Sequence, residues 1–247
     1  MNLRTEEPST RVRPEYAALA EEFGALAADF GHRIDTELRR DIARLAATME
    51  CIDRHVDDVT DDVRRRTLWA SVLDLLERGE ERTDGDERDE REDLAEELAR
   101  ATVAVRELAI RRQVLARIVR IVRKEIATSE QLRDASNVDD YVRGVLREGR
   151  LTAALALVVA GPACGAAFRR FFFRLAGPAN VIDKLNDAAD DHARGEIRLE
   201  PGLELHGRLA LAVVVRLPSL LASHPSLGRV ITLGVKYLGS QLTAPIH

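Results

Sequence analysis

Apolar side chains recur every three or four residues along most of the chain, which is the repeat of an amphipathic α-helix. The clearest set is Leu38, Ile42, Leu45, Met49, Ile52, Val56 and Val59. Strand-like alternation does not extend over any useful length. We expect helices near residues 16–27, 38–61, 67–76, 94–128, from 137 into 151–168, 168–191, 205–217 and 226–240. The pattern predicts an all-α bundle of about eight helices, formed by one domain over residues 1–247.

Polar and turn-forming residues interrupt this pattern at identifiable points. The run ERGEERTDGDERDERED, residues 77–93, is dense in charge and predicts a solvated surface loop. Asn137 stands directly before an apolar-periodic segment, so we expect it to cap the start of a helix. Gly177 and Pro178 predict a kink inside the helix of residues 168–191.

Two apolar stretches raise the question of a membrane span. The longer, LTAALALVVAGPACGAAF at residues 151–168, borders on the length that crosses a bilayer. A Gly-Pro pair in its middle and two arginines directly after it favour a buried core helix. The stretch 209–222 is interrupted by Arg216 and Pro218, so we do not expect it to cross a membrane either. Peripheral contact with a membrane stays open.

Composition narrows the classes of function. The net charge of −5 disfavours binding to nucleic acid, because a basic surface is needed to displace counterions from phosphates. The N-terminal residues MNLRTEEPST contain no apolar signal segment, and Cys51 and Cys164 lie far apart, so a reduced, cytoplasmic setting is expected. We interpret Cys51 as a small hydrophobic residue of its helix. Homodimer formation stays open.

Aspartates line the margin of the apolar face on two of the expected helices. On the first, Asp53, Asp57 and Asp61 follow one another at intervals of four residues. On an ideal helix they share one edge of the apolar stripe, whereas Asp58 faces solvent. On the second helix, three aspartates and an arginine line one edge: Asp183, Asp187, Asp190 and Arg194. The sequence therefore predicts two acidic ladders beside one core.

Like charges at this spacing repel each other, more strongly when they are partly desolvated. A hard divalent cation such as Mg²⁺ would relieve that repulsion, and phosphate oxygens of a substrate commonly complete its coordination. Two facing ladders thus suggest a diphosphate held through metal ions. The alternative is that the acidic edges are only solvated, since Asp and Glu make up 42 of the 247 residues and such spacings arise easily by chance.

Three segments resemble the squalene/phytoene synthase-like branch of the class I isoprenoid synthases. ELRRDIARLAATMECIDRHVDDVTDD, residues 37–62, is similar to the pattern LRRAIxALYxFCRxxDDIVDD of that branch. DKLNDAADDHARGEIRLEP, residues 183–201, resembles NILRDVGEDxxxGRxYLP. Between them, DDYVRGVLREGRLTAALAL falls where the branch has EYCxxVAGxVG. The order and separation of the segments agree, and from the first to the last they span about two thirds of the chain.

The resemblance implies a single-domain helical bundle of the isoprenoid synthase type around a central apolar cavity. Metal-bound aspartates at its mouth would ionise an allylic prenyl diphosphate, which implies Mg²⁺ as cofactor. The residues expected to act in catalysis are Asp57, Asp61, Asp187 and Asp191. The expected metal ligands are Asp57, Asp58, Asp61, Asp183, Asp187, Asp190 and Asp191. The cations expected to bind the diphosphate are Arg54, Arg143, Lys184 and Arg194.

The chain departs from the branch at several of these positions. Asn186 and Glu196 replace arginines, and Asp183 stands where asparagine is usual. The short chain disfavours a head-to-head condensation of two long diphosphates. We therefore expect a prenyl transferase or a terpene synthase. The alternative is a non-catalytic helical interaction protein with degenerate aspartate motifs.

Overall fold

The computed structural model describes residues 14–57, 59, 61–79 and 91–225. The elements are α1 (Pro14–Asp29), α2 (Thr36–Asp57), α3 (Asp62–Arg78), α4 (Arg91–Arg111), α5 (Leu115–Arg133), α6 (Val138–Ala160), the 3-10 helix η1 (Gly161–Ala163), α7 (Ala166–Ala193), α8 (Leu203–Val214) and α9 (Leu217–Ser223). No strand occurs in this described part of the chain, and the predicted all-α fold is confirmed.

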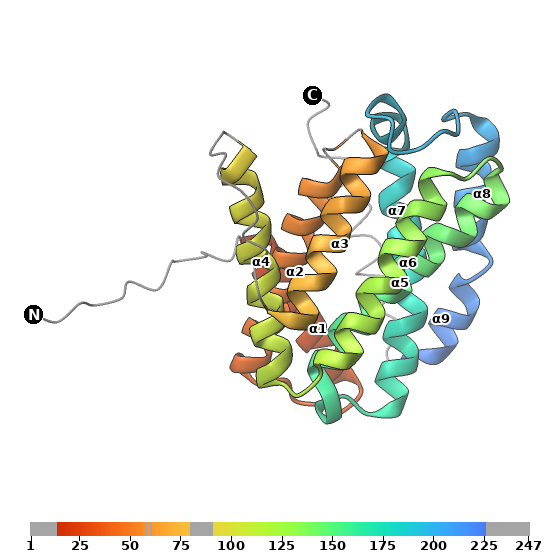
Figure 1. The fold of residues 1–247 in the computed structure, drawn as a ribbon. Helices are drawn as coiled ribbons and strands as arrows, with labels where there is room; N and C mark the ends of the chain where they lie inside the picture. The colour runs from red at the N-terminus through yellow and green to blue at the C-terminus, as the bar shows by residue number, and fades with distance from the viewer. Residues whose placement is uncertain (1–13, 58, 60, 80–90, 226–247) are drawn as a thin grey trace, which may run out of the picture.

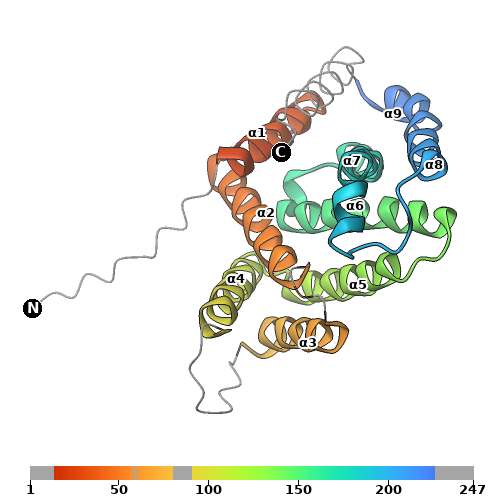
Figure 2. The same cartoon turned by 90° about the horizontal axis from the view of Figure 1, so that it is seen from above.

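Helix α6 is the central helix of the bundle, because it packs against α2, α5, α7 and α8. Figure 1 shows the order of the helices, and Figure 2 shows α6 and α7 surrounded by α1, α2, α5, α8 and α9. Helices α3 and α4 lie outside α2 and α5. Polar side chains on α6 are therefore positioned to meet side chains from several neighbouring helices.

Local sequence explains where α6 and α7 begin and end. The side chain of Asn137 accepts a hydrogen bond from the backbone N–H of Asp140 at 2.8 Å, which confirms the predicted N-cap of α6. The helix ends at Gly161, whose φ of 55° is readily adopted only by glycine. Helix α7 continues through Pro178 without ending there.

Two boundaries expected from the sequence are wrong. The helix expected over 38–61 ends at Asp57, and α3 begins at Asp62 after the N-cap Asp61. Asp53, Asp57 and Asp61 therefore do not lie on one continuous helix. The single helix expected over 94–128 is two helices, α4 and α5, separated at Gln113, whose φ of 57° is left-handed and interrupts a right-handed helix.

Two parts of the predicted organisation are not described by the structure. The expected surface loop of residues 77–93 has its centre, residues 80–90, outside the described residues. The helix expected over 226–240 lies outside them entirely.

The buried apolar side chains form two separate clusters. The larger one gathers residues of α1 to α7 and of α9, and it includes Val122 of α5 and Leu155 of α6. The smaller one lies between α5, α6, α7 and α8 and includes Leu132 of α5 and Val145 of α6. Polar side chains of α5, α6 and α7 lie between or beside the two clusters along these three helices. We call this the polar layer, and its described members are Glu125, Glu148, Thr152, Asn180 and Lys184.

The two apolar stretches of the sequence have different environments. In the stretch 151–168, side chains such as Leu155, Leu157 and Phe168 are buried, which confirms the prediction of a core segment. By length and composition, Leu203–Ser223 is the one described segment apolar enough to cross a membrane, and only 22% of its most apolar part is buried. Its exposed apolar side chains are Leu203, Leu211, Val214, Val215 and Leu217.

Candidate functional site

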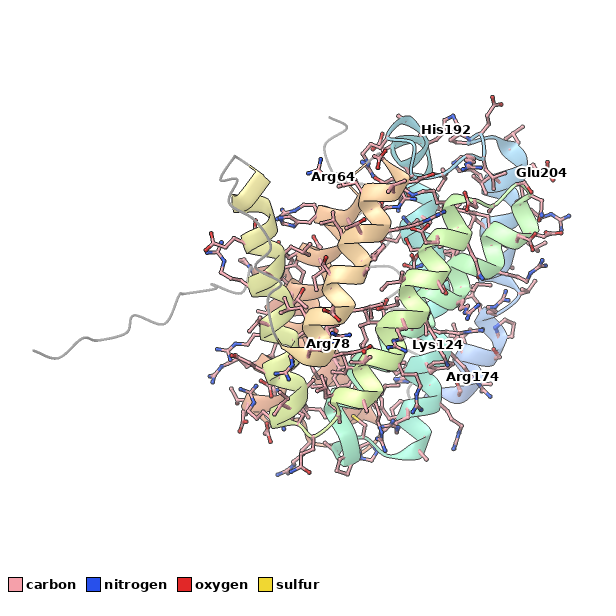
Figure 3. All side chains as sticks on the ribbon, viewed as in Figure 1. Arg64, Arg78, Lys124, Arg174, His192 and Glu204 are labelled. Atoms are coloured by element: carbon pink, nitrogen blue, oxygen red, sulfur yellow. The ribbon has the colours of Figure 1, made fainter. Side chains whose placement is uncertain are left out.

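The two acidic ladders predicted from the sequence lie at the same end of the bundle. We call the chain around them the first acidic segment, residues 53–62, and the second acidic segment, residues 183–194. Figures 1 and 3 show the end of α2, the start of α3 and the end of α7 at the top of the view, with Arg64 and His192 marking the last two. The side chain of Asp57 and the whole of Asp58 lie outside the described part of the structure. The described acidic groups of the first segment are therefore Asp53, Asp61 and Asp62.

Asp61 has a structural role in the fold. Its carboxylate accepts a hydrogen bond from the backbone N–H of Arg64 at 2.7 Å and so caps the N-terminus of α3. The next residue, Asp62, accepts a hydrogen bond from Arg65 at 2.8 Å. This hydrogen bond and the charge of Arg65 lower the pKa of the Asp62 carboxyl, and Arg133 adds to the same effect from farther away.

Two buried arginines, which the sequence analysis did not select, lie beside the first acidic segment. Arg65 is 3% exposed and also donates to Glu130 at 3.1 Å, but its buried Nη1 has no hydrogen-bond partner. Arg133, at the end of α5, donates to the backbone carbonyl of Gly195 at 3.3 Å. Arg133 thus lies between the start of α3 and the segment that follows α7, so it connects the two predicted halves of the site.

The second acidic segment contains one fully buried carboxylate. Asp191 is 1% exposed, and its two oxygens accept hydrogen bonds from Lys184 at 2.8 Å and Arg194 at 2.7 Å. Burial lowers the pKa of the Lys184 ammonium, but the carboxylates of Glu148 and Asp191 outweigh burial and raise it overall. Asp191 and Lys184 therefore form a buried ion pair, with Arg194 on the solvent side.

The other aspartates of α7 lie nearer to solvent. Partial desolvation raises the pKa of the Asp187 carboxyl, and the carboxylates of Asp183 and Asp191 add to that effect. Asp183 is half-buried, and Asp190 is exposed. Carboxylates that repel one another in this way are the arrangement that a bound cation would stabilise.

The polar layer places further carboxyl groups inside the bundle, next to the acidic segments. Glu125 of α5 accepts a hydrogen bond from Thr152 at 3.3 Å through Oε1, while its Oε2 is buried without a hydrogen-bond partner. Burial and the nearby carboxylates of Asp53 and Glu148 raise the pKa of the Glu125 carboxyl well above its usual value. Asp53 of the first acidic segment therefore interacts electrostatically with Glu125.

Glu148 joins α6 to α7 at a point of close backbone contact. Its Oε2 accepts a hydrogen bond from Asn180 at 2.9 Å, and the same amide donates to the carbonyl of Val145 at 2.9 Å. The next residue, Gly149, leaves no room for a side chain, since an added Cβ would lie 2.6 Å from the Cβ of Asn180. Burial raises the pKa of nearby Tyr141 to about 12, with smaller contributions from the surrounding charges.

The remaining predicted phosphate-binding cations have partners elsewhere on the surface. Arg143 pairs with Asp140 one turn earlier on α6. Arg54 lies 3.8 Å from Glu97 of α4. Exposed ion pairs of this kind are weak, so either arginine could turn toward a new anion at little cost.

Sequence reasoning missed Glu125 and Glu148, although a signal for Glu125 was present. Glu125 lies seven residues after the buried Ile118 and three after Val122, in the phase of the core face of α5. A charged residue in that phase indicates a buried polar contact. The link through Arg133 had no such signal, because its partner Gly195 is 62 residues away along the chain.

Two surface hollows are described, and neither contains a residue of the predicted site. One, of about 460 Å³, is lined by Asp29, Phe30 and residues 222–225. The other, of about 410 Å³, lies between Glu77 and the first two turns of α5. The central apolar cavity implied by the resemblance stays a prediction.

Comparison with known proteins gave no relatives: the chain matches no family model, no curated protein and no solved structure.

Proposed function

We propose that the protein is a Mg²⁺-dependent enzyme that ionises an allylic prenyl diphosphate, as a prenyl transferase or a terpene synthase related to the squalene/phytoene synthases. The observation that carries the proposal is the position of Arg133. This buried arginine interacts with Asp62 at the start of α3 and donates to Gly195 beyond the end of α7. A diphosphate and its metal ions need such a mixture of acidic ligands and fixed cations.

The acidic groups suit a hard divalent cation. Partial burial and the neighbouring carboxylate of Asp183 raise the pKa of Asp187, and the start of α3 lies at the same end of the bundle as the end of α7. A bound Mg²⁺ would stabilise the negative charge that develops on the leaving diphosphate. The carboxylate of Asp53 raises the pKa of the buried Glu125 carboxyl, so negative charge from this acidic cluster reaches into the bundle.

The cations would hold the diphosphate itself. Arg65 has a buried N–H group without a hydrogen-bond partner, and the Nη1 of Arg133 donates to the carbonyl oxygen of Gly195 at 3.3 Å. Lys184 and Arg194 already form ion pairs with Asp191. They would therefore attract the diphosphate through their positive charge without leaving this carboxylate. The protein would thereby orient the leaving group before the carbon–oxygen bond breaks.

The second candidate function is a non-catalytic helical interaction protein. The observation in its favour is that two expected metal ligands already serve the fold. Asp61 caps α3, and Asp191 is neutralised by Lys184 and Arg194. A bundle whose acidic side chains are used in this way needs no bound metal for its stability.

Titration calorimetry with Mg²⁺ and inorganic pyrophosphate separates the two functions. We expect binding by the wild-type chain that requires the metal. Arg133→Gln should weaken it by about 10–100-fold, the value of a hydrogen bond to a charged group. Asp187→Asn should weaken it through loss of a metal ligand. Arg117→Gln, an exposed change on the same helix as Arg133, should have no effect.

Absence of pyrophosphate binding by a folded wild-type protein would refute the enzyme proposal and favour the interaction protein. Equal weakening by Arg133→Gln and Arg117→Gln would show that binding is only a general response to positive charge. If both specific variants lose binding, a series of prenyl diphosphates of increasing chain length identifies the substrate.

A cytoplasmic location with peripheral membrane contact is part of the proposal. The exposed apolar side chains of α8 and α9, such as Leu211 and Val214, support such contact. Lipid-soluble prenyl chains would then reach the enzyme from the membrane surface. The same exposed apolar side chains of α8 and α9 could instead pack against a second copy of the chain in a homodimer.

A further inference from the structure

A second group of metal-ligating side chains lies on α2, outside the polar layer. Cys51 and His55 are four residues apart, so they share one face of this helix, and Glu97 of α4 lies opposite. One potential ligand atom from each of the three residues lies within 4.8 Å of the others. The group joins two helices that are far apart in sequence and pack closely together.

His55 is oriented as a metal-binding histidine is. The ring is 7% exposed, and its Nδ1 lies 2.6 Å from the backbone carbonyl of Cys51. Since a carbonyl only accepts, Nδ1 must carry the hydrogen, which leaves a lone pair on Nε2 in the neutral ring. That Nε2 is buried and makes no hydrogen bond. Metal-binding histidines are commonly fixed by such a bond from the other ring nitrogen.

The contacts of Glu97 with the other two residues have the length of the edges of a zinc tetrahedron, although they involve its two different oxygens. The Nε2 of His55 lies 3.3 Å from one oxygen of Glu97, and the Sγ of Cys51 lies 3.6 Å from the other. With zinc bonds of about 2.0–2.3 Å, ligand atoms of a tetrahedral site are separated by about 3.3–3.7 Å. Only small side-chain movements are needed for one metal ion to contact all three residues.

We propose that Cys51, His55 and Glu97 form a binding site for zinc or a similar divalent metal of borderline softness. A thiolate, an imidazole and a carboxylate together favour zinc over Mg²⁺, which prefers oxygen ligands alone. Three protein ligands leave a fourth position for water. The exposed carboxylate of Glu97 opens the site to solvent, and the half-exposed Arg54 beside it is free to turn away.

This inference does not rest on the proposed prenyl diphosphate activity. The site would connect α2 to α4 directly, because its ligands come from both helices. A metal bound there stabilises the folded chain, since the unfolded chain does not hold the three ligands together.

Cobalt(II) is the probe for this site, because its bond to a thiolate gives an intense charge-transfer absorption band. The full chain is freed of metal with a chelator and titrated with Co²⁺, without pyrophosphate. We expect one equivalent to produce the thiolate band and Zn²⁺ to abolish it by displacement. Cys51→Ala should remove the band, whereas Cys164→Ala, a change at the other, buried cysteine, should retain it.

Two further variants keep the test independent of folding defects. Glu97→Gln alters an exposed side chain, so the fold should be kept. Loss of a residue that only orients a metal ligand weakens metal binding by about 10–100-fold. Glu97 is itself a proposed ligand, so this variant should weaken cobalt binding by more than that. His206→Gln, at a half-buried histidine of α8, should leave binding unchanged. Zn²⁺ should also raise the melting temperature of the wild type but not of Glu97→Gln. A wild-type chain without a thiolate band at equimolar Co²⁺, or a band that Cys164→Ala also removes, would overturn the proposal.

Discussion

Replacing Gly149 with alanine should destabilise the protein because α6 and α7 touch at this residue. The added methyl group would lie 2.6 Å from the Cβ of Asn180 and even closer to the carbonyl oxygen of Ala176. Normal contacts of about 3.5 Å require the two helices to separate by about 1 Å. Overpacking of this kind costs about 3 kcal/mol, and the better helix propensity of alanine returns about 1 kcal/mol. The expected net loss is about 2 kcal/mol.

Gly207 provides the matched control for this change. It lies inside α8, and an added Cβ there would meet nothing within 4 Å. Gly207→Ala should therefore stabilise the chain by about 1 kcal/mol through helix propensity alone. Urea denaturation followed by circular dichroism measures both values. In a thermal scan, Gly149→Ala should lower the melting temperature by about 4–8 °C.

If the two alanine variants were equally stable, the contact between α6 and α7 at Gly149 would be refuted. The same outcome would also remove the basis for the bond between Asn180 and Glu148, since that bond depends on the short distance between the helices. A loss of stability for Gly149→Ala alone would support both.

Two further predictions concern buried charge. Burial raises the pKa of Glu125 in the folded protein, so the folded state binds this proton more tightly than the unfolded state does. The free energy of unfolding should therefore fall as the pH rises from the ordinary carboxyl pKa to the raised one. Glu125→Gln should match the wild type in urea denaturation at pH 4 and exceed it at pH 8; an equal difference at both pH values would contradict the pKa assignment. Asp41 is 1% exposed and pairs with Arg111 and Arg112 at the junction of α4 and α5. Asp41→Asn should cost about 3 kcal/mol of unfolding free energy, because it leaves two arginines without their buried partner; denaturation curves that coincide with the wild type would show that the pair contributes nothing.

Hydrophobic periodicity was sufficient to predict the helical fold, but not every helix boundary. The start of α6 was predicted from Asn137, because a short polar side chain before an apolar repeat has a local, physical meaning. The end of α2 was missed although Asp61 is an equally good cap. The repeat of apolar positions continued through Val59 and obscured the break. Gln113 carried no signal, since neither glycine nor proline marks its left-handed turn.

The candidate site was predictable only in part, for a related reason. Aspartates on a helix edge can be read from spacing, but their partners come from other helices. That Asp191 is neutralised by Lys184 follows from a spacing of seven residues on one helix, which is visible in the sequence. The role of Arg133 and the pairing of His55 with Glu97 depend on how α5 and α4 pack, which no local pattern specifies.

The polar layer has a consequence for how the sequence of this protein can change. Because the buried side chains form two clusters with no member in common, substitutions around Leu155 act on a different set of packed side chains from those around Val145. Their effects on stability should be additive, whereas substitutions within one cluster should be coupled. Each half of the interior can therefore accumulate compensating changes without the other. Glu148 and Asn180, which are hydrogen-bonded to each other between α6 and α7, have the least freedom to vary.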